Sequence, residues 1–157
     1  ATTEIYTLYL HDALPIYDDD FLRISDKIKQ IELTTSGELR VSFKESRSFF
    51  HSKKSLEELA KIEFLHLKMN NTRDKTGILF FFLLKERMFY IFADSGIHSL
   101  VEQKTWDDIR DKIQIGFKEG KYLEAILTGL DDAGKVLSAH FPRKADDTDE
   151  LSNKVEF

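Results

Sequence analysis

The chain has 157 residues, of which 41% are hydrophobic and 32% charged, and its formal net charge is −5. A chain of this length can bury a full core in one domain. Its negative charge argues against nucleic-acid binding, because phosphate neutralisation requires a basic surface. The absence of cysteine excludes a disulfide framework and a thiolate site.

The first sixteen residues differ in character from the rest. Thr7–Ile16 reads TLYLHDALPI, which resembles the conceptual translation of a common sequencing adaptor with one change. We interpret residues 1–16 as a non-native or disordered tail, and a native tail or edge strand is the alternative. The segment is not typical of a signal peptide, since its start is not basic and His11 and Asp12 interrupt its apolar residues. Without an export signal, a cytoplasmic protein is the default expectation.

A helix, a strand and a second helix are predicted next. Asp18–Thr34 has an acidic start and isoleucines at helical spacing, which predicts a helix. Thr35–Gly37 ends it, because glycine is a common helix stop. Glu38–Phe43 alternates and contains β-branched and aromatic residues, which indicates a strand. Ser55–Glu58 is a capping box that opens the second helix.

Two apolar runs then form a hairpin signal. Ile78–Leu84 and Met88–Ala93 have strand length and are separated by the charged turn Lys85–Arg87. Both runs are apolar on successive residues, so both faces of the sheet should be covered by helices. Neither run is long enough to cross a bilayer. A helix joins the first strand to the second, which favours a parallel pair with a right-handed crossover. The sequence therefore predicts an α/β fold, a three-layer α/β/α sandwich with a small mixed central sheet.

Helices fill the rest of the predicted domain. Asp94 or Ser95 should cap a short helix, Thr105 should cap the next, and Lys121–His140 should form the last long helix. Pro142 stops further helix. We thus expect one domain over residues 17–142, followed by a polar, acidic tail over residues 143–157.

Several motifs in register resemble the TPM domain family, in particular its short single-domain bacterial members. The main carriers are TSGELRV at Thr35–Val41, Gly77 with its apolar strand, DSGI at Asp94–Ile97, and the acidic stretch Asp146–Leu151. The chain departs from the family pattern at Lys68, where the family has Gly. The resemblance implies an α/β sandwich, calcium binding in some members and a reported phosphatase activity.

Predicted topology brings three carboxylates to one sheet edge. Glu38 begins the first strand, Asp74 lies in the loop before Gly77, and Asp94 ends the third strand, which runs antiparallel to the other two. Oxygen ligands of this kind suit Ca²⁺, with Mg²⁺ as the alternative, and backbone carbonyls and water would complete the shell. The alternative is that Asp94 only caps the helix that follows. Further ligand-shell or anion contacts at this edge would be Thr72, Lys75, Ser95 and His98.

The opposite edge carries the basic loop Lys44–Lys54. Ligands of open α/β sheets usually bind beyond the carboxyl ends of parallel strands, which is where this loop lies. With Phe49, Phe50 and His51, the loop could bind an anion or an acidic partner. The alternative is a solvated loop whose Phe side chains pack into the core.

Three functions remain open from the sequence. The first is a non-enzymatic, calcium-binding accessory module, monomeric by default, that acts with a protein partner. The second is a metal-assisted phosphomonoesterase at the same edge, with Asp94 holding the ion and Lys75 or Arg40 near the phosphate. The third is a structural interaction domain without an ion. The chain has no P-loop, no G-x-S-x-G and no dinucleotide fingerprint, so no catalytic residue is assigned.

Overall fold

The computed structural model describes residues 17–143. The adaptor-like segment and the acidic tail beyond Arg143 lie outside the described residues. In chain order the elements are α1 (Asp18–Glu32), β1 (Glu38–Lys44), η1 (Phe49–His51), α2 (Leu56–His66), η2 (Met69–Asn71), β2 (Gly77–Leu83), β3 (Met88–Ala93), α3 (Ser95–His98), α4 (Gln103–Lys118) and α5 (Tyr122–His140).

The sheet has three strands in the order β1-β2-β3. β1 and β2 are parallel, with Glu38 opposite Gly77 at one end and Lys44 opposite Leu83 at the other. β2 and β3 are antiparallel, and Leu83 pairs with Met88 across the turn. The chain returns from β1 to β2 through α2, as the parallel pairing requires. The predicted mixed sheet is confirmed.

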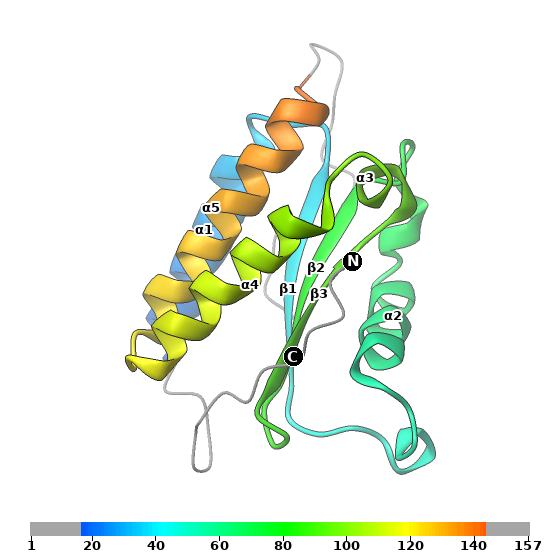
Figure 1. Ribbon diagram of the computed structural model, residues 1–157, viewed down its shortest axis with the longest axis vertical. Coiled ribbons are helices and arrows are strands. Elements are labelled where there is room, and N and C mark those ends of the chain that lie inside the picture. Colours follow the sequence, from blue (N-terminus) through cyan, green and yellow to red (C-terminus); the bar gives the residue numbers. More distant parts are fainter. Residues whose placement is uncertain (1–16, 144–157) are drawn as a thin grey trace.

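Helices cover both faces of this sheet, so the predicted three-layer sandwich is also confirmed. α1, α4 and α5 lie on one face and α2 lies on the other (Figure 1). Every residue of β2 is buried, which explains why its sequence, GILFFFL, is apolar throughout rather than alternating. Within the described residues, no helix combines the length and the hydropathy needed to cross a bilayer.

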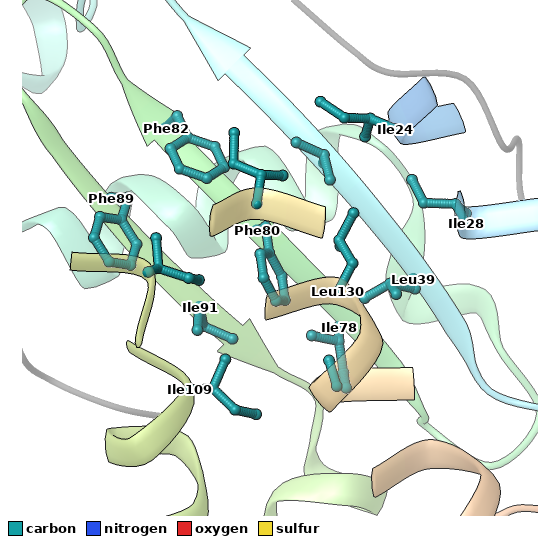
Figure 2. Close-up of a cluster of buried hydrophobic side chains, with 14 of the residues drawn as sticks. Ile24, Ile28, Leu39, Ile78, Phe80, Phe82, Phe89, Ile91, Ile109 and Leu130 are labelled. Carbon is teal, nitrogen blue, oxygen red and sulfur yellow. The ribbon is translucent and has the colours of Figure 1, made fainter. Parts of the chain in front are cut away.

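The larger core lies between the sheet and the three-helix layer. Figure 2 shows side chains from α1, α4 and α5 meeting alternate residues of the three strands. Aromatic rings fill the end of this core that lies nearest the hairpin turn. Phe43 stacks on Phe82 with ring centroids 4.9 Å apart, and Phe82 contacts Phe89 at 5.7 Å. The alternation fixes which side chains of β1 face α2 instead, namely Glu38, Arg40, Ser42 and Lys44.

Helix ends differ from the prediction by one to three residues. α1 ends at Glu32, because Leu33 already forms its C-cap. α4 starts at Gln103 with Glu102 as N-cap, so the prediction that Thr105 caps it is wrong. The Thr105 backbone N–H instead donates to the Glu102 carbonyl, 3.0 Å away, within the first turn.

The TSG motif joins the two ends of the domain. Thr35 forms a bridge with Pro142, and its hydroxyl donates to the carbonyl of Phe141. The same hydroxyl accepts from the backbone N–H of Gly37 at 3.0 Å. These contacts hold the end of α5 against the start of β1, and thereby fix the edge of the sheet at which Glu38 lies.

Candidate functional site

The predicted convergence of strand ends places Glu38 and Asp94 at one edge of the sheet. Gly77 lies between them, because it pairs with Glu38 on one side and its carbonyl accepts from the Asp94 N–H at 2.9 Å on the other. Glu38 is 3% exposed, and it is engaged in further interactions with the surrounding chain.

Asp94 uses one carboxylate oxygen as a helix cap. Its Oδ1 accepts from the backbone N–H of Ser95 at 2.7 Å, and its carbonyl accepts from the N–H of His98 at 2.9 Å. Its Oδ2 is buried and accepts no hydrogen bond from the described residues. Buried polar atoms are nearly always hydrogen-bonded, to protein, to water or to an ion. Asp94 therefore caps α3 and still has one buried oxygen available.

Backbone carbonyls of the loop before β2 lie against the first turn of α3. The Gly96 N–H donates to the carbonyl of Lys75 at 2.8 Å. The carbonyl of Asp74 is so close that a Cβ on Gly96 would lie 1.9 Å from it. Glycine permits this approach because it has no side chain. The buried Oδ2 of Asp94 and the carbonyls of Asp74 and Lys75 thus all lie near the first turn of α3.

Loop side chains at this edge mostly support the backbone. The Thr72 hydroxyl accepts from the N–H of Thr76 at 3.2 Å, which closes the loop. Lys75 has a φ of 55° and its Nζ donates to the carbonyl of Asn70 at 2.6 Å. The carboxylate of Asp74 is exposed.

The three predicted carboxylates do not form a ready-made ligand cluster. Among residues 17–143, no group of three or more His, Asp or Glu side chains is arranged to hold a metal ion. His98 and Ser95 are exposed as whole residues, but the neighbouring chain partly desolvates the His98 imidazole and lowers its pKa from the ordinary value of 6.5. An ion at this edge would therefore depend on Asp94 and on backbone oxygens.

A second polar cluster lies on the α2 face. Glu63 of α2 is 5% exposed, and it accepts a short hydrogen bond from the hydroxyl of Ser42. The Lys44 Nζ lies 3.6 Å from its Oε2, and the His66 Nδ1 lies 3.3 Å from its Oε1. On the same face Arg40 donates to the carbonyl of Leu67 at 3.4 Å.

This cluster borders a cavity of about 480 Å³ at the carboxyl ends of β1 and β2. Its apolar wall comes from Leu59, Ile62, Phe81 and Leu83. The sequence interpretation placed a possible ligand site at this edge but did not name Glu63. A signal was available, because Glu63 follows Ala60 by three residues and so interrupts the apolar stripe of α2.

In the basic loop at this edge, the two Phe side chains do not lie where the sequence analysis predicted. Phe49 and Phe50 are 87% and 89% exposed, so the prediction that their side chains pack into the core is wrong. Their rings contact each other edge to face, with centroids 5.9 Å apart. The reason is geometric, since the 3-10 turn that carries them lies below α2 and away from the sheet (Figure 1).

Comparison with known proteins agrees with this architecture. The family model described as the TPM domain matches residues 16–136. The solution structure of the BA42 protein from the psychrophilic bacterium Bizionia argentinensis is similar, with a TM-score of 0.80 and 32% sequence identity. The match covers 90% of this chain and 94% of BA42. A comparison with curated protein sequences found no match. The motifs, the mixed sheet with its two helical layers and the family match together show that this chain belongs to the TPM domain family.

Proposed function

We propose that this TPM domain is a calcium-binding accessory module that acts with a protein partner, and that Asp94 is the central ligand. The observation that carries the proposal is the buried Oδ2 of Asp94, which accepts no hydrogen bond from the described residues. Leaving a carboxylate oxygen buried without a partner costs about 1–3 kcal/mol or more. A bound cation would remove that cost.

The surrounding donors are of the kind that calcium prefers. The carbonyl oxygens of Asp74 and Lys75 lie against the same turn of α3, and Asp74 also carries an exposed carboxylate on this loop. Calcium takes six to eight oxygen ligands and accepts carbonyls and water freely, whereas zinc favours nitrogen and sulfur. Glu38, Thr72 and water are the further candidates to complete the shell, and Mg²⁺ is the alternative ion.

We expect this site to be weak. Calcium affinity rises with the number of charged ligands and with the rigidity of the site. Here one carboxylate oxygen is in place and the others would have to turn toward the ion, since the described residues hold no preformed cluster. A dissociation constant of roughly 10⁻⁴–10⁻³ M is therefore expected, in the range of extracellular calcium modules.

A metal-assisted phosphomonoesterase at the same edge is the alternative. The cations that this reaction would need near the phosphate are occupied elsewhere. The Lys75 ammonium donates to the carbonyl of Asn70, and Arg40 is buried and donates to the carbonyl of Leu67. This geometry favours an accessory role, and turnover of a generic phosphomonoester separates the two functions.

Thermal unfolding with and without calcium tests the proposal. At ten times the dissociation constant, an ion that binds only the folded state adds about 1.4 kcal/mol. For a domain of this size the Tm should rise by about 3–6 °C. Asp94→Asn is isosteric and keeps the capping oxygen, so it should fold and lose the calcium response. Asp108→Asn on the exposed face of α4 is the matched control and should keep it.

Each other outcome identifies an alternative. A calcium response that survives in Asp94→Asn would contradict the site. Hydrolysis of p-nitrophenyl phosphate by the wild type but not by Asp94→Asn would support the phosphatase. If neither a calcium nor a magnesium response nor turnover is observed, the ion-free interaction domain is the better account.

A further inference from the structure

We propose that the loop between β1 and α2 is a membrane-docking tip that inserts Phe49 and Phe50 into an anionic lipid surface. This tip, defined as residues 44–54, begins at the carboxyl end of β1, whereas Asp94 bonds to Gly77 at the opposite edge of the sheet. Figure 1 shows α3, which Asp94 caps, at that opposite end. The inference is thus independent of the calcium proposal.

The first observation is the exposure of two adjacent aromatic side chains. Phe49 and Phe50 are the most exposed large hydrophobic residues among those described, at 87% and 89%. None of the other exposed ones among the described residues, such as Leu33, is adjacent in sequence to another. Single exposed apolar residues are ordinary, but a pair of adjacent large aromatics is an apolar surface that water solvates poorly.

The second observation is that the tip is held in a defined conformation. Arg47 bonds to both carboxylate oxygens of Glu86, in the turn between β2 and β3, at 2.5 and 2.6 Å. Its Nη1 donates to the carbonyls of His51, Ser52 and Lys54, the last at 2.7 Å. The Ser48 hydroxyl accepts from the Phe50 N–H. A bidentate guanidinium with three further carbonyl partners orders the loop, so the two rings are presented without the entropy cost of ordering a flexible segment.

The third observation is charge. Residues 44–54 hold the cations Lys44, Arg47, Lys53 and Lys54 and the single carboxylate Glu45, on a chain whose net charge is −5. Much of this charge is compensated, since Lys44 pairs with Glu63 at 3.6 Å, Lys54 with Glu58 at 3.7 Å and Arg47 with Glu86. Exposed pairs of the Lys54–Glu58 kind are weak and exchange readily with other anions. With four cations and one carboxylate, the segment itself therefore carries a formal charge of +3 on an acidic molecule.

These observations favour a lipid surface over a protein partner. A stable protein interface buries about 800 Å² on each side, which one turn of 3-10 helix cannot supply. The tip extends from the body of the domain at the end where the β2–β3 turn also lies (Figure 1), so its two exposed rings lie at one end of the domain rather than on a broad face. Aromatic residues flanked by Lys and Arg are typical of segments that lie in the headgroup region of an anionic bilayer.

Vesicle co-sedimentation of the full chain in EDTA tests the proposal. We expect binding to vesicles of phosphatidylcholine with phosphatidylserine, little binding to phosphatidylcholine alone, and loss of binding in high salt. Phe49→Ser and Phe50→Ser should each weaken the partition by about tenfold, because each removes an aromatic side chain that would insert into the bilayer. Leu33→Ser, which removes a side chain that is 72% exposed elsewhere, should bind as the wild type does.

Fluorescence gives a readout of insertion itself. The native Trp106 is fully buried, so its emission should not respond to vesicles. A Phe50→Trp variant should show a blue shift with anionic vesicles and quenching by brominated lipid. Wild-type protein that does not bind anionic vesicles, or Phe→Ser variants that bind like the wild type, would overturn the proposal. Binding to polyglutamate but not to vesicles would overturn it in favour of an acidic protein partner.

Discussion

Among the described glycines, Gly96 is the one at which an added Cβ would meet the closest atom, and it lies at the candidate calcium edge. In Gly96→Ala the new Cβ would lie 1.9 Å from the carbonyl oxygen of Asp74 and 2.5 Å from that of Lys75. Both are backbone atoms, so neither can move aside by changing a rotamer. The loop or the first turn of α3 must shift, and the 2.8 Å hydrogen bond from the Gly96 N–H is then weakened.

The expected loss of stability follows from these contacts. Overpacking a tight site costs about 1–3 kcal/mol, and the hydrogen bond contributes about 1 kcal/mol. Alanine restricts the unfolded chain relative to glycine, which returns about 0.5 kcal/mol. We therefore expect Gly96→Ala to lower the free energy of unfolding by about 1.5–3.5 kcal/mol, measured by urea denaturation with the m-value monitored.

Gly120→Ala is the matched control. Gly120 has a φ of 77°, and nothing lies within 4 Å of an added Cβ. Its substitution therefore tests backbone strain without steric overlap, and it should cost only about 1 kcal/mol. If the free energy of unfolding of Gly96→Ala is within about 0.5 kcal/mol of the wild-type value, the loop does not pack on α3 as described. That result would refute the contribution of the loop carbonyls to the calcium edge.

Three further predictions concern single side chains. Lys68 follows α2 with a left-handed φ of 59°, a conformation in which glycine is the common residue. Lys68→Gly should therefore raise the free energy of unfolding, measured by urea denaturation, by up to about 1 kcal/mol. As the control, Lys61→Gly within α2 should lower it by about the same amount. Arg47→Gln should cost about 1–3 kcal/mol and speed proteolysis within residues 48–54, because the loop loses its anchor; unchanged cleavage would contradict that role. Burial lowers the pKa of His98, so the unfolded chain binds the proton more readily, and stability should fall as pH drops below about 6.5. In denaturation curves at several pH values His98→Gln should flatten that fall, and an identical pH profile would show that another group is responsible.

The fold was predictable where one physical signal dominated. The continuous apolar runs of β2 and β3 required burial on both faces, and the structure buries every residue of β2. The predicted N-cap at Ser55 is formed, since its hydroxyl accepts from the Glu58 N–H at 3.1 Å, while the Glu58 carboxylate accepts from that hydroxyl at 3.2 Å rather than from the Ser55 backbone N–H of a full capping box. Such local rules do not depend on distant parts of the chain, which is why they held.

Features that depend on contacts between segments far apart in the sequence could not be predicted from the hydrophobic pattern. Hydrophobicity alone suggested that Phe49 and Phe50 turn inward, yet the Arg47 anchor directs the loop away from the core. The buried pair of Ser42 and Glu63 joins residues 21 positions apart, on different elements. Strand order and direction did predict which edge Glu38 and Asp94 share. They could not predict that one oxygen of Asp94 would cap α3 while the other stays buried without a hydrogen bond.

The most direct measurement is a calcium titration of the ¹⁵N-labelled full chain followed by ¹H–¹⁵N correlation spectra. The account predicts saturable shifts concentrated at the amides of Lys75, Asp94, Ser95 and Gly96, and their loss in Asp94→Asn. The amides of the tip, residues 44–54, should not move. Shifts confined to the acidic stretch Asp146–Glu150, or no saturable shift at any amide, would contradict a calcium site at Asp94.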